Sequence, residues 1–127
     1  MSTFGKITEK VKIDKALAPQ DIDSAQSSDW FDMAGYRRAI AVLVTEEISD
    51  GEEVTLKINE AKDDSGDSDQ ELDEIVVEAD GNEELKIELE ISTDDMTDGY
   101  THIQVEAEAD SADDAAAILL RSDKRYK

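Results

Sequence analysis

Several residue types that support chemistry or cross-linking are missing or rare in this chain of 127 residues. There is no cysteine, so disulfides and thiolate metal sites are excluded. His102 is the single histidine, which rules against a zinc site of histidine and cysteine ligands within one chain. No apolar run approaches the roughly 18 residues that a membrane-spanning helix needs. These gaps predict one domain that is held by its own hydrophobic core, with no cofactor and no membrane partner.

Charge of one sign dominates what is present. Asp and Glu number 34 against 13 Lys and Arg, for a formal charge of −21, and the acids concentrate between residues 39 and 120. They alternate there with Val, Ile and Leu, which places them on the wet faces of ordered strands. Because molar salt shortens the screening length to about 3 Å, we hypothesise a halophilic source for so acidic a fold. Phosphate would be repelled, so we expect no nucleic-acid partner.

The longest apolar run covers residues 37–45. Its β-branched residues alternate with Ala39, Ala41 and Leu43, a pattern that predicts a strand buried on both sides. An Asp-Gly pair at residues 50–51 then suits a turn. We therefore expect the next alternating segment, 54–61, to form an antiparallel hairpin with this strand.

A period of two recurs along the rest of the chain and predicts short strands separated by polar turns. The single proline, Pro19, indicates a break before a polar loop at 20–29, and Ser92 or Thr93 would cap one helical turn. Seven or eight strands indicate an all-β, antiparallel β-sandwich over 29–127, preceded by an extended N-terminal arm and loop over 1–28. The remaining strands are expected near 10–16, 71–79, 85–91, 100–109 and 115–120.

Candidate sites for chemistry are few. The acidic stretch with Asp63, Asp64, Asp67 and Asp69 could gather oxygen ligands for a cation, but Gly66 falls at the wrong place for an EF-hand, and a solvated acidic loop explains the same residues. The single histidine has no recognisable nucleophile context and no glycine-rich phosphate loop exists, so we predict that the chain is not an enzyme.

The ends of the chain are the more informative candidates for a partner interface. Trp30, the only tryptophan, is either a core plug or an exposed anchor. Basic residues near both ends oppose the charge of the body, which is explained by solvation or by docking on another acidic subunit. The candidate interface residues are Trp30, Phe31, Lys6, Lys10, Lys12, Lys15, Arg121, Lys124, Arg125 and Tyr126.

The segment 29–42 carries a family resemblance. Its aromatic-Asp-Met-small-Gly-Tyr turn, entering a buried strand, resembles small virion proteins found beside capsid genes of tailed phages and tailed archaeal viruses. Further matches lie at 55–61, 98–105 and 115–120, before a basic and aromatic end. The resemblance implies a β-sandwich or jelly-roll-like fold and a capsid decoration (cement) or minor capsid protein. The heavy acid load departs from the family pattern and points to a halophilic virus.

This resemblance implies a structural role on the virion surface. The chain would sit as a homotrimer on a lattice of major capsid protein and stabilise the head. Residues 1–6 lack the apolar core of a signal peptide, so we expect synthesis in the host cytoplasm. Two alternatives remain open: a head–tail connector or tail component of the same virion, and a cation- or glycan-binding β-module.

Overall fold

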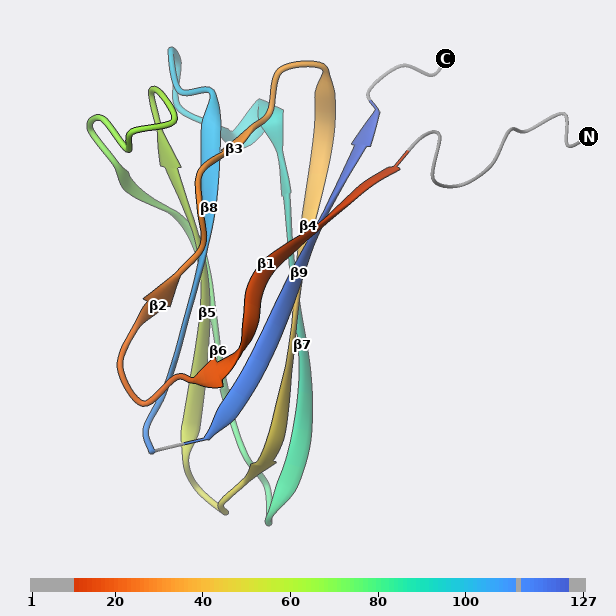
Figure 1. Ribbon diagram of the computed structural model, residues 1–127, viewed down its shortest axis with the longest axis vertical. Coiled ribbons are helices and arrows are strands. Elements are labelled where there is room, and N and C mark those ends of the chain that lie inside the picture. The colour runs from red at the N-terminus through yellow and green to blue at the C-terminus, as the bar shows by residue number, and fades with distance from the viewer. Residues whose placement is uncertain (1–10, 112, 124–127) are drawn as a thin grey trace, which may run out of the picture.

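The computed structural model describes residues 11–111 and 113–123, which form two antiparallel β-sheets packed face to face (Figure 1). This confirms the predicted all-β sandwich. Among the described residues, no helix is long and apolar enough to cross a membrane. The elements are β1 (Val11–Asp21), β2 (Gln26–Ser27), β3 (Phe31–Asp32), β4 (Tyr36–Ile48), β5 (Glu53–Ala61), β6 (Gln70–Glu78), β7 (Glu83–Ser92), the 3-10 turn η1 (Thr93–Asp95), β8 (His102–Ala109) and β9 (Asp114–Asp123).

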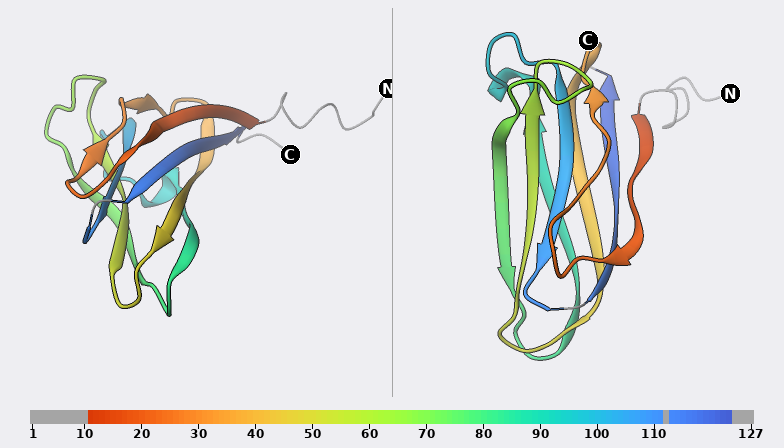
Figure 2. Two further views of the ribbon diagram at one scale, coloured as in Figure 1. Left: turned by 60° about the horizontal axis from the view of Figure 1, so that its bottom comes forward. Right: turned by 60° about the vertical axis from the view of Figure 1, so that its left-hand side comes forward.

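The strand order defines the topology. One sheet runs β1-β9-β4-β7, and the other runs β2-β8-β5-β6 with β3 also paired to β8. The antiparallel partners nest like one long folded hairpin: β1 with β9, β2 and β3 with β8, β4 with β7, and β5 with β6. Two sheets connected in this way form a jelly roll, which confirms the jelly-roll-like fold. Figure 2 shows the same arrangement of strands from two further directions.

The expected hairpin between residues 37–45 and 54–61 is wrong, because β4 and β5 lie in opposite sheets. The turn at Asp50 and Gly51 carries the chain across the sandwich instead of folding it back. Gly51 N donates to Ala79 O over 2.9 Å, and Asp50 N donates to Asn82 Oδ1 over 2.9 Å. The turn is therefore bonded to the β6–β7 crossover at the same end of the sandwich.

The prediction that the strand over 37–45 is buried on both sides is also wrong. Ala39, Ala41 and Leu43 are buried between the sheets, whereas Val44 is 48% exposed on the outer face. Nothing in the described part of the chain covers that outer face. The apolar residues of β4 alternate between core and surface, as they do in any strand of a two-layer sandwich.

The core confirms the inward faces predicted from the period of two. Leu56 of β5 and Val105 of β8 are fully buried between the sheets. The predicted helical turn is also confirmed, because the side chain of Ser92 accepts a hydrogen bond from Asp94 N at the start of η1. These are features that local sequence controls.

The segment before residue 29 pairs with both sheets. β1 is longer than the strand expected over 10–16 and forms the edge beside β9. Pro19 lies inside β1, where its register is irregular, and an edge strand tolerates the missing backbone donor. Ile22, in the predicted polar loop, is fully buried. Residues 11–28 are thus bonded to the sandwich, although the sequence suggested an arm and loop.

Candidate assembly surface

Arg121 closes one end of the sandwich. Its guanidinium forms an ion pair with Asp14 over 2.6 Å and donates to the carbonyl oxygen of Asp32. It also lies over the rings of Phe31 and Tyr36, at 5.4 Å and 4.8 Å from the ring centres, which suits cation–π attraction. Only 7% of Arg121 is exposed. This residue, predicted in a partner interface, therefore joins β1, β3, β4 and β9 inside the chain.

At the same end of the sandwich, the start of β1 lies beside the end of β9. Val11 of β1 lies opposite Ser122 of β9, so the described parts of both ends emerge side by side (Figure 1). Lys12 and Lys15 are exposed there. The other basic and aromatic candidates of the two ends lie outside the described residues; they are Lys6, Lys10, Lys124, Arg125 and Tyr126.

Trp30 is half-buried, and its indole lies against Gly66 in the acidic loop between β5 and β6. A Cβ built on Gly66 would lie 2.8 Å from Trp30 Nε1, and Gly66 has a φ of +81°. Only glycine meets both requirements without strain. Trp30 therefore holds the conformation of this loop, and Phe31 beside it packs partly against the core.

The four aspartates proposed for a cation do not converge. Asp63 accepts hydrogen bonds from the backbone N–H groups of Asp67 and Ser65, and these bonds lower the pKa of its carboxyl. Asp64 and Asp69 are exposed. Within residues 11–111 and 113–123, no group of three or more histidine, aspartate or glutamate side chains is placed to hold a metal ion. Asp63 instead shapes the loop.

His102 lies at the start of β8, half-buried, beside the same loop. Thr101 Oγ1 donates to Lys62 O over 3.0 Å, and His102 Nδ1 lies 2.8 Å from that hydroxyl oxygen. The Thr101 hydroxyl and the His102 ring are therefore within hydrogen-bond distance of each other. His102 is thus tied into the loop contacts.

Glu60 is a buried carboxylate that the sequence reasoning missed. It is 1% exposed and accepts hydrogen bonds from Gln70 Nε2, Thr97 N and Thr97 Oγ1. These contacts hold the loops before β6 and after β7 to the end of β5. The sequence did contain a signal for this burial. Glu60 comes two residues after the inward-facing Ile58, so the period of two places it on the inward face as well.

The outer faces of the two sheets differ in character. Val76 is the exposed large hydrophobic residue on the acidic sheet that contains β6, at 47% exposure. The β1-β9-β4-β7 sheet exposes Ile13, Val44 and Ile118 at 51%, 48% and 41%. Contiguous exposed apolar residues of this kind indicate an interaction surface.

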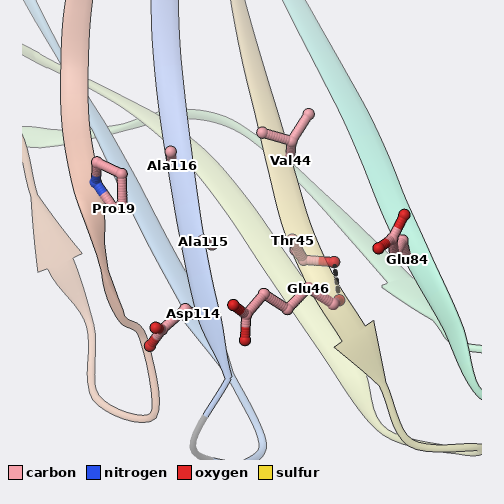
Figure 3. A pocket seen from close by; sticks show the side chains of 8 residues that line it. All are labelled: Pro19, Val44, Thr45, Glu46, Glu84, Asp114, Ala115 and Ala116. Carbon is pink, nitrogen blue, oxygen red and sulfur yellow. Dashed lines mark hydrogen bonds between the residues drawn. The ribbon is translucent and has the colours of Figure 1, made fainter.

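A shallow depression of about 280 Å³ lies at the lower end of this apolar face (Figure 3). Its floor is apolar and its rim carries carboxylates from three strands, so it can receive a group with an aliphatic stem and a positive end. The residues that line it are Pro19, Val44, Thr45, Glu46, Glu84, Asp114, Ala115 and Ala116.

Comparison with known proteins relates this fold to viral capsids. No protein-family model and no curated protein matches the chain. Among solved structures, infectious bursal disease virus strain Gx aligns with a TM-score of 0.59 at 13% identity, covering 93% of this chain and 33% of that chain. The VP2 subviral particle of the same virus aligns with a TM-score of 0.57 at 16% identity, covering 89% and 32%.

At these low sequence identities, the two structural alignments show a shared fold and nothing more. The chain is a β-sandwich of the jelly-roll type that these viral capsid proteins also contain. It spans about a third of the length of each of these two chains.

Proposed function

We propose that the chain is a virion structural protein, specifically a decoration (cement) protein that binds the assembled major capsid protein lattice. The observation that carries this proposal is the nested jelly-roll pairing, which the chain shares with viral capsid proteins. The resemblance of residues 29–42 to small virion proteins of tailed viruses supports the same role.

The mechanism is stabilisation by mass action. A protein that binds only the assembled lattice lowers the free energy of that state and raises the temperature at which capsids fall apart. Lys12 and Lys15 lie at the end of the sandwich where both chain ends emerge, and their charge suits docking on an acidic neighbouring subunit. The acidic outer face of the other sheet then points to solvent, as suits a virion in concentrated salt.

The test is to add purified protein, in molar salt, to capsids that lack it. Stoichiometric binding over the whole lattice, seen by electron microscopy, together with a raised capsid melting temperature, is the expected result. Binding at one vertex alone would replace the decoration role with that of a connector. Absence of binding at saturating concentration would reject a virion role on this lattice. A Lys12→Glu variant is expected to bind the lattice more weakly if the basic end docks.

A further inference from the structure

The two central strands of the β1-β9-β4-β7 sheet, β4 and β9, are apolar on the outer face across three consecutive rows of paired residues. Val42 of β4 lies opposite Ile118 of β9, with Ile40 opposite Leu120 on one side and Val44 opposite Ala116 on the other. Their neighbours along the strands point into the core, so these six side chains share the outer face. A depression of about 130 Å³ between Val42, Val44 and Ile118 shows that this surface is uneven.

The two ends of this apolar face carry opposite charges. Arg38 lies beyond the upper row and is exposed, with its guanidinium 3.0 Å from Glu90. Glu46 lies beyond the lower row and joins Glu84 and Asp114 around the depression of Figure 3. Arg38 and Glu46 stand four residues before and four residues after Val42 on the same strand, so a positive and a negative side chain flank the centre of the face on opposite sides.

We propose that this face binds a second copy of the chain around a two-fold axis that passes beside Val42, perpendicular to the strands. Such an axis places the apolar rows of both copies on one another and seats each Arg38 in the carboxylate-rimmed depression of its partner. A two-fold interface is isologous, so both contacts form twice. An axis parallel to the strands would instead bring the two carboxylate-rimmed ends together.

Charge and size both favour a second copy. Most of the surface of a chain with a net charge of −21 repels its own kind. On this face, Arg38, Lys15 and Lys86 offset part of the charge of Glu84, Glu88 and Glu90, and the paired residues of β4 and β9 at the centre are uncharged. Four strands about 4.8 Å apart and about ten residues long present roughly 600 Å² in projection. The accessible area of this face is larger than its projection, because the side chains make the surface uneven. It therefore approaches the roughly 800 Å² that each partner buries in a standard interface.

This pairing is an alternative to the trimer implied by the family resemblance, and it does not rest on the capsid role. It is measured on purified full-length protein alone, in molar salt, by sedimentation equilibrium over a wide concentration range. The expected result is a reversible monomer–dimer equilibrium. Val44→Glu is expected to raise the dimer dissociation constant at least tenfold. Val76→Glu, the same change at matched exposure on the other sheet, is expected to leave it within about twofold.

A charge exchange tests the orientation. Arg38→Glu and Glu46→Arg are each expected to weaken the dimer at least fivefold, and the double variant is expected to recover most of that loss. Lys62→Glu, an equal charge change on an exposed loop, serves as the control. A protein that stays monomeric at millimolar concentration, a trimer, or a dimer insensitive to Val44→Glu would overturn the proposal. If the losses in dimer affinity of the two single variants simply add in the double variant, the proposed axis is wrong. Capsid binding is measured in a separate experiment, so its outcome does not decide the dimer proposal.

Discussion

Replacing Arg121 by methionine is expected to destabilise the sandwich more than the removal of any exposed arginine. Methionine keeps an unbranched apolar stem at the position but removes the ion pair with Asp14 and the hydrogen bond to the Asp32 carbonyl. It also removes the cation from between the rings of Phe31 and Tyr36. The contact that links β1, β3, β4 and β9 at the closed end would be lost.

The size of the loss follows from opposing contributions. A hydrogen bond to a charged group is worth about 1.5–3 kcal/mol, and each cation–π contact adds about 0.5–1 kcal/mol. The Asp14 side chain is 24% exposed, so water screens part of the ion pair and can solvate the carboxylate that the substitution leaves unpaired. Among the described residues, Arg121 Nε has no hydrogen-bond partner, which already reduces what the arginine contributes. The net expectation is a loss of about 2–4 kcal/mol.

Urea unfolding at low protein concentration measures this loss as a lower midpoint with an unchanged slope. Arg38→Met, which breaks an exposed pair with Glu90, is the matched control and is expected to cost about 0.5 kcal/mol or less. A double-mutant cycle of Arg121→Met with Asp14→Asn is expected to give a coupling energy of about 1–2 kcal/mol. If Arg121→Met costs no more than the control, the reasoning about this buried cation is refuted.

Four further predictions concern the loops and the charge. Glu60→Gln is expected to cost about 1–3 kcal/mol in urea unfolding, because the new amide group would face a backbone or side-chain donor. Gly66→Ala is expected to cost about 1 kcal/mol more than Gly99→Ala, since both positions have positive φ but only at Gly66 would the new Cβ meet Trp30. The carboxyl of Asp63 is expected to titrate below its ordinary pKa of 3.8, followed by carbon chemical shifts. Its stabilising contribution is then present above the ordinary pKa and lost as pH falls through the lowered folded pKa. Finally, the melting temperature is expected to rise between low and molar salt, as screening relieves repulsion among the 34 acidic residues.

Each of these has its own contrary outcome. A Glu60→Gln variant as stable as the parent would mean that the buried carboxylate is not needed as an acceptor. Equal costs at Gly66 and Gly99, or an unchanged tryptophan emission in Gly66→Ala, would exclude the contact with Trp30. A pKa of Asp63 at or above 3.8 would contradict the two backbone donors. A melting temperature independent of salt would remove the case for adaptation to a saline environment.

The sequence predicted the strands of this protein because alternation is a local property. Leu85 to Ile91 and Ile103 to Ala107 show the period of two without help from distant residues, and their inward faces are the ones buried in the structure. The cap at Ser92 was predictable for the same reason. Composition and alternation together indicated that the surface would be acidic. Where carboxylates alternate with apolar residues along a strand, the apolar residues face the core and the carboxylates face solvent.

The tertiary structure decided what depends on residues far apart in the chain. Whether the Asp50–Gly51 turn closes a hairpin or crosses the sandwich depends on its bonds to Ala79 and Asn82, about thirty residues away. The run 37–45 is apolar on both faces, and only the arrangement of the sheets shows that one face lies open. In the sequence, Arg121 belongs to a basic tail. In the structure it is buried and paired with Asp14, more than a hundred residues away. Local periodicity fixes which residues point together, but the pairing of strands across the chain determines which of those faces the protein buries and which it leaves for a partner.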